Sequence, residues 1–165
     1  MDNLLRLLII DDNLNDAEMM VSTLKSAGLA VRPERAEDEE DLLAKLKQHP
    51  PDVIVCTLGH PSLSLEKVIQ ASRQMGRHAP VVAVATNPDT DVVECLESGA
   101  HDMVRKGHLD HLRLVITRAL TFQQQWRSLK SLESSLRETE RRCKMLLDNA
   151  RDAIAGVGKL TIETG

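Results

Sequence analysis

The sequence has almost no aromatic residues: Phe122 and Trp126 are the only two, and tyrosine is absent. Because hydrophobic residues still make up 42% of the chain, the core must consist of leucine, valine, isoleucine, alanine and methionine. The net charge is −4, and no block of lysine and arginine with interleaved aromatics occurs, so we expect no nucleic-acid partner. With 165 residues, the chain can form one globular domain and an extension.

Long apolar runs and paired cysteines are also lacking. The stretch Leu4–Ile10 contains Arg6 and is too short for a membrane span, and it has no signal-peptide cleavage pattern. Cys56, Cys95 and Cys143 have no CxxC spacing, which argues against a disulfide or metal framework. From these absences we predict a cytoplasmic protein with no cofactor and no membrane span.

Short apolar runs alternate with amphipathic helical patterns through the first two thirds of the chain. The predicted strands are Arg6–Ile10, Leu29–Arg32, Asp52–Thr57, Pro80–Ala85 and His101–Val104. The predicted helices between them are Leu14–Ala27, Glu37–Gln48, Leu63–Met75 and Asp89–Ser98. Such alternation favours an α/β fold with a parallel sheet of five strands and helices on both faces.

In parallel sheets of this kind, chemistry gathers at the carboxyl ends of the strands. The residues at those ends are Asp11, Asp12, Thr57, Ala85, Thr86 and Lys106. No glycine-rich phosphate loop follows the first strand, and no Ser-His-Asp or Cys-His set stands at the strand ends. The sequence therefore disfavours an enzyme.

A long helix is predicted from His108, because no helix breaker appears until Gly156. Apolar or small residues recur in steps of three and four at Leu112, Val115, Ala119, Phe122, Trp126 and Leu129. After a shift of phase they resume at Leu132, Leu136, Thr139, Cys143, Leu146 and Ala150. We interpret the stripe as a coiled-coil seam that forms a homodimer, with the first six residues as seam positions and Trp126 as an anchor.

Four segments resemble the receiver domains of two-component response regulators. They are Leu7–Asn13, Pro51–Val55 with Pro61 beyond it, Pro80–Val82 and Gly99–Lys106, in the family's order and spacing. The resemblance covers about residues 5–120. It implies a flavodoxin-like (βα)5 receiver fold whose last helix extends into a coiled coil.

Three residues of the family's phosphorylation site have counterparts here. By this resemblance, Asp11 and Asp12 stand at the acidic pair that helps hold Mg²⁺, and Lys106 stands at the lysine that pairs with the phosphoryl group. Other roles remain open. The two aspartates either stand at a helix N-terminus, where the helix dipole favours acidic side chains, or keep weak Mg²⁺ binding. Lys106 is expected to form an ion pair with one of them.

Other positions differ from the family's pattern. The acceptor position, four residues before Pro61, holds Thr57, which has no carboxylate to form an acyl phosphate. The switch hydroxyl falls on Ala85, with Thr86 one residue later, and the switch aromatic falls on Met103. Gly107 replaces the proline that usually follows the lysine. The resemblance thus implies a degenerate receiver, which is not phosphorylated at Thr57.

A second resemblance concerns the end of the chain. Residues 143–155 look like the helix that leads into a PAS domain. A degenerate receiver followed by such a helix resembles FimX-type proteins, which carry receiver, PAS, GGDEF and EAL modules and are linked to cyclic di-GMP signalling, type IV pili and twitching motility. The predicted organisation is a receiver-like domain over 1–120, a signalling helix continuous with it over 121–150, and over 151–165 the start of a PAS domain or a foreign tail.

Two functions remain open at this point. The first is a dimerisation, localisation and signal-relay module that serves the downstream domains of the same chain and a protein partner of unknown identity. The second is a working receiver that uses another acceptor, Asp11 or Asp12, or retains Mg²⁺ binding.

Overall fold

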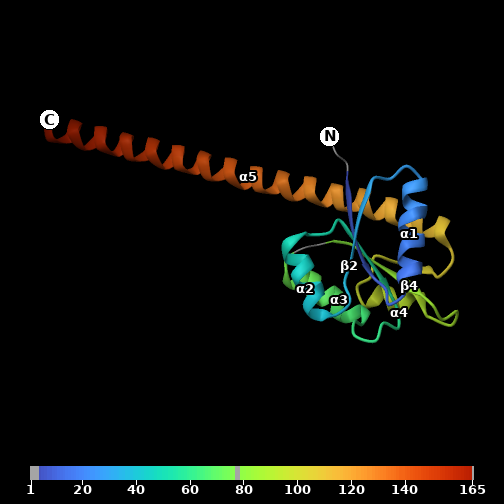
Figure 1. Cartoon of the computed structure of the whole chain (residues 1–165). Coiled ribbons are helices and arrows are strands. Elements are labelled where there is room, and N and C mark those ends of the chain that lie inside the picture. Colours follow the sequence, from blue (N-terminus) through green and yellow to red (C-terminus); the bar gives the residue numbers. More distant parts are fainter. Residues whose placement is uncertain (1–3, 77–78, 165) are drawn as a thin grey trace. The chain divides into compact units, whose positions relative to one another are not determined.

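The structure is a computed structural model that describes residues 4–76 and 79–164 (Figure 1). Strands and helices alternate along this part of the chain. Their bounds are β1 Leu5–Ile10, α1 Leu14–Ser26, β2 Val31–Arg35, α2 Glu39–Gln48, β3 Val53–Thr57, α3 Leu65–Gln74, β4 Val81–Ala85, α4 Val92–Glu97, β5 Asp102–Arg105 and α5 Leu109–Thr164.

The strands form one parallel sheet in the order β2-β1-β3-β4-β5. This order confirms the predicted flavodoxin-like fold. In this order β2 lies on one side of β1 and β3 lies on the other, so the direction in which strands are added reverses at β1. Ligands of open α/β sheets bind at such a reversal, outside the carboxyl ends of the strands. Asp11, directly after β1, and Thr57, the last residue of β3, lie at this place.

The sheet is buried on both faces, and alternate residues of each strand feed two separate cores. Leu8 and Ile10 pack with residues of α2 and α3, whereas Leu7 and Ile9 pack with residues of α1 and α5. Figure 1 shows α1 on the opposite side of the sheet from α2 and α3. Strands covered on both faces need continuous apolar runs, which is why aliphatic side chains suffice for this core.

Two predicted elements need correction. The second strand was predicted at Leu29–Arg32, but β2 runs from Val31 to Arg35 and includes Pro33. Proline is tolerated there because β2 is an edge strand, where a missing N–H need not break the ladder. The fourth helix was predicted from Asp89. It begins at Val92, because Asp91 is the N-cap and accepts a hydrogen bond from the Val93 N–H.

The long helix α5 forms as predicted, but its first turns serve the domain's own core. Leu112, Val115 and Ala119 are buried beneath the sheet face that α1 also covers, so their assignment to a dimer seam was wrong. Phe122 is half-exposed and its ring lies 5.3 Å from that of His101. The helix also passes through Gly156, where the sequence predicted its end, and reaches Thr164.

The chain divides into two compact units, Met1–Gln124 and Gln125–Gly165. In the second unit the apolar side chains of α5 are exposed; they include Trp126, Leu129, Leu132, Leu136, Leu146 and Ile154. Among the described helices, none has a stretch apolar and long enough to cross a membrane.

The burial of α5 can be tested with two residues of the same turn. Ile116 is fully buried, whereas Leu114 is 52% exposed. We expect Ile116→Ala to lower the free energy of unfolding by about 2–5 kcal/mol, because it leaves a cavity in the core. Leu114→Ala should change it by about 0.5 kcal/mol or less. Urea unfolding of both variants measures the difference, and equal losses would contradict this packing.

Candidate functional site

The candidate site lies where β1, β3, β4 and β5 end. Parallel registers pair Ile10 with Cys56 and Thr57 with Val84, so the residues that follow these strands meet at one edge of the sheet. Asp11 and Asp12 follow β1, and Lys106 follows β5. The sequence predicted this grouping from the strand ends alone.

A buried hydrogen bond between Thr57 and Asp11 forms the centre of the site. The Thr57 Oγ1 hydroxyl donates to Asp11 Oδ2 at 2.9 Å. The other carboxylate oxygen, Oδ1, accepts from the Asn13 N–H, also at 2.9 Å. Asp11 is 2% exposed and Thr57 is 4% exposed. Both oxygens of the buried carboxylate therefore have donors, as a buried charge requires.

The hydrogen bonds of Asp11 bear on the weak Mg²⁺ binding that the sequence left open. The ion takes oxygen ligands in near-octahedral geometry and is held by carboxylates, but Asp11 directs its oxygens to Thr57 and Asn13. Asp12 is exposed and is the remaining carboxylate of the predicted pair. Within the described part of the chain, no three Asp, Glu, His or Cys side chains group so that they could hold a metal ion.

Lys106 has a different partner from the one the sequence suggested. Its Nζ lies 2.6 Å from Oδ2 of Asp16, in the first turn of α1, and not on Asp11 or Asp12. The hydrogen bond to Asp16 is the main reason that the pKa of Lys106 is raised, and the charges of Asp11 and Asp12 act in the same direction. The sequence did not predict Asp16 as the partner, because no motif or spacing links a residue of α1 to Lys106.

The glycine after Lys106 has a backbone conformation that excludes proline. Gly107 has a φ of 90°, whereas the proline ring fixes φ near −65°. The described residues include no cis peptide bond. Gly107, where the family's pattern has proline, therefore has a backbone conformation that proline could not adopt.

The two positions predicted for the switch residues belong to the apolar core. Ala85 is 3% exposed and Met103 is 4% exposed, and both pack in the cluster with α2 and α3. Thr86, the nearby hydroxyl, is exposed. Beside the site, burial raises the pKa of the Cys56 thiol to about 12, with the charges of Asp11 and Glu66 as further causes. That thiol stays protonated at neutral pH and is no nucleophile.

The Thr57 hydroxyl can be tested by an isosteric change. Thr57→Val keeps the shape but removes the donor, so Oδ2 of Asp11 would be buried without a partner. We expect the free energy of unfolding to fall by about 1–3 kcal/mol. Thr57→Ser keeps the hydroxyl and should lose less. Denaturant unfolding of the two variants at neutral pH is the measurement; a valine variant as stable as the serine variant would contradict the role given to this bond.

Comparisons with known proteins agree with this geometry. The family model described as "Response regulator receiver domain" matches residues 7–117. The curated regulatory protein AtoC of Escherichia coli (strain K12) is 27% identical over 133 residues, which cover 79% of this chain and 28% of AtoC. The chain thus spans little more than a quarter of that relative's length.

Two solved structures show the same fold. NtrX from Brucella abortus superposes with a TM-score of 0.66 at 22% identity, over 79% of this chain and 30% of NtrX. The receiver domain of a Francisella response regulator superposes with a TM-score of 0.61 at 22% identity, over 70% of this chain and 96% of its own. The family match over most of the chain, the strand order and the acidic strand end lead to one conclusion: the chain belongs to the response regulator receiver domains of two-component signalling.

Proposed function

We propose that this receiver is a non-phosphorylatable pseudo-receiver that works as a dimerisation, localisation and signal-relay module. The hydrogen bond from Thr57 to Asp11 carries the proposal. A threonine hydroxyl cannot form the acyl phosphate that an aspartate forms. Here the hydroxyl is also buried and engaged, so phosphoryl transfer to Thr57 would first have to break this contact.

Other features of the site support the loss of switching. A phosphorylated receiver needs groups that respond to the new charge. Ala85 and Met103 are packed in the core and offer no hydroxyl or aromatic ring for that response. Lys106, which would pair with a phosphoryl group, is in an ion pair with Asp16. The site is thus stable without a phosphoryl group.

The second part of the proposal is constitutive dimerisation through α5. Leu129, Leu136 and Cys143 follow one another at intervals of seven residues. Leu132 and Leu146 lie three residues after Leu129 and Cys143, at the second apolar position of the same heptads. Their exposed fractions are large, from 61% to 69% for the four leucines. Apolar residues at the a and d positions of heptads are what a two-stranded coiled coil buries. We therefore assign the seam to this part of α5.

Ion pairs on α5 leave this stripe clear. Arg137 pairs with Glu133 at 2.7 Å and Arg142 pairs with Glu138 at 3.0 Å, each across one helical turn. These exposed pairs contribute little to stability. They keep charged groups on the sides of the helix and leave the leucine stripe for a second copy of the chain.

The wider context of the proposal comes from the resemblance alone. A receiver joined by a helix to the start of a PAS domain fits a FimX-type protein of cyclic di-GMP signalling, type IV pili and twitching motility. In such a protein a parallel pair of α5 helices would deliver two downstream PAS, GGDEF and EAL arrays side by side. We assign no residue of the site described above to cyclic di-GMP.

A second candidate function rests on Asp12. This carboxylate is exposed at the end of β1, next to the buried Thr57–Asp11 pair. A receiver with a non-standard acceptor would use it, and its assembly would then respond to Mg²⁺ and a phosphoryl analogue.

Assembly state distinguishes the two functions. We expect sedimentation equilibrium to give a dimer both with and without Mg²⁺ and beryllofluoride, because the seam does not involve the acidic site. Leu136→Asp should shift the chain to monomer, since it buries a charge in the seam. Ser134→Asp, two residues away on another face of α5, is the matched control. A monomer that dimerises only with beryllofluoride would favour the second candidate.

Cys143 reports the orientation of the helices in the same experiment. It is exposed on α5 and lies on the leucine stripe. In a parallel, in-register dimer, two copies of Cys143 face each other and should crosslink under mild oxidation. A dimer in which Cys143 fails to crosslink would contradict the parallel arrangement.

A further inference from the structure

Two arginines lie side by side at the opposite end of the sheet from Thr57. Arg6 of β1 and Arg32 of β2 are direct partners in the parallel register. Neighbouring strands are about 4.8 Å apart, so paired side chains project from the same face of the sheet. Like charges placed opposite each other in this way destabilise a sheet. The pair therefore has an electrostatic cost that a bound anion would remove.

The two guanidinium groups have no ion pair within residues 4–76 and 79–155. Two acids lie nearby and both are engaged. Glu34 is paired with His49, Oε1 to Nδ1, at 3.4 Å, and Asp52 Oδ2 accepts a hydrogen bond from the Arg6 backbone N–H at 2.9 Å. Both carboxylates therefore already accept from a partner other than the Arg32 guanidinium group.

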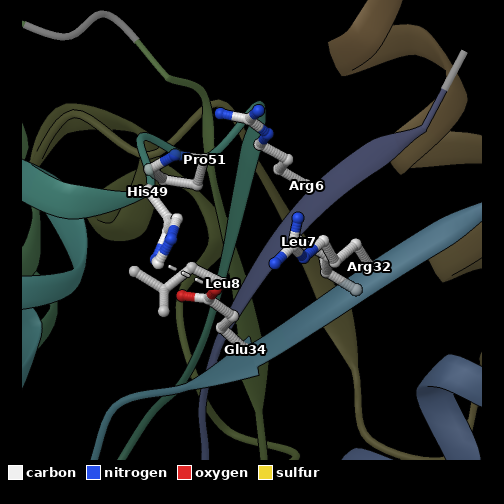
Figure 2. Close-up of a pocket in the computed structure, with 7 residues that line it drawn as sticks. All are labelled: Arg6, Leu7, Leu8, Arg32, Glu34, His49 and Pro51. Atoms are coloured by element: carbon white, nitrogen blue, oxygen red, sulfur yellow. Dashed lines mark ion pairs between the residues drawn. The ribbon is translucent and has the colours of Figure 1, made fainter. Parts of the chain in front are cut away.

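These side chains surround a small hollow. In Figure 2, Arg6 and Pro51 lie above it, His49 to the left, Arg32 to the right and Glu34 below. Its volume is about 10 Å³, and Leu7 and Leu8 form part of its wall. A space of this size holds one water-sized group. One oxygen of an anion could enter it while the rest of the anion stays at the rim, within reach of the arginine side chains.

We propose that this hollow is a binding site for a phosphoryl group. Two guanidinium groups carry two positive charges, which match a phosphate dianion better than a single carboxylate. Guanidinium groups bind phosphate oxygens through paired N–H donors. The imidazole of His49 offers one further donor. The source of the phosphoryl group is either free phosphate or a small phosphorylated molecule such as a nucleotide.

This site is independent of the proposed pseudo-receiver function. It lies at the amino ends of the strands, whereas Asp11 and Thr57 lie at the carboxyl ends. An anion here would hold β1, β2 and the end of α2 together. Its occupancy would change the stability of the domain without any change at Thr57.

The test is the binding of phosphate to the full chain. We expect phosphate to raise the unfolding midpoint in a saturable way at constant ionic strength, and chloride to have no such effect. Arg6→Gln and Arg32→Gln should each weaken the apparent affinity by roughly tenfold or more, as expected for a charge-assisted bond. Without phosphate at low salt, neither variant should be less stable than the wild type, because each removes the repulsion.

Arg118→Gln, at an exposed arginine of α5, is the matched control and should bind phosphate as the wild type does. Isothermal titration with phosphate and with adenosine diphosphate distinguishes the sources. Tighter binding of the nucleotide assigns the site to a phosphorylated small molecule, and equal binding assigns it to free phosphate. No saturable effect in the wild type, or the same effect in Arg6→Gln and Arg32→Gln, would overturn the proposal.

Discussion

The buried hydrogen bond between Thr57 and Asp11 determines how the carboxyl end of this sheet works. A carboxylate with 2% exposure must be compensated, because an isolated buried charge is costly. With an aspartate at position 57, two carboxylates would face each other and would need a cation between them. With threonine, a neutral donor supplies the compensation. Under the proposed function, the pocket then needs neither a metal nor a phosphoryl group, and the neighbouring positions no longer act as switches.

The other residues of the site are consistent with this proposed loss of switching. Lys106 forms an ion pair with Asp16. Gly107 has a backbone conformation that proline cannot adopt, and Ala85 and Met103 pack in the core. Under the proposed function, the working part of the domain is the parallel sheet on which the first turns of α5 pack. A module of this kind transmits position and association rather than a chemical state, which is the function proposed for it.

Much of the fold could be predicted from the sequence, because strands buried on both faces leave continuous apolar runs between helical patterns. The placement of Asp11, Thr57 and Lys106 at one sheet edge followed from that order. The Lys106–Asp16 pair could not be predicted, since it depends on how α1 lies against the end of β5. The seam was overextended for a related reason: a periodic stripe on α5 does not reveal whether the domain or a second chain covers it. Leu112 is covered by the domain, whereas Leu129 is exposed.

The central claim is that the pocket around Thr57 no longer responds to a phosphoryl group. Amide NMR spectra of the chain during titration with Mg²⁺ and beryllofluoride test it most directly, with a phosphorylatable receiver as the positive control for the reagent. We expect the signals of Asp11, Asp12, Thr57 and Lys106 to stay in place while the control shifts. Saturable, Mg²⁺-dependent shifts at these residues would show that the pocket still binds a phosphoryl analogue, and would contradict the claim.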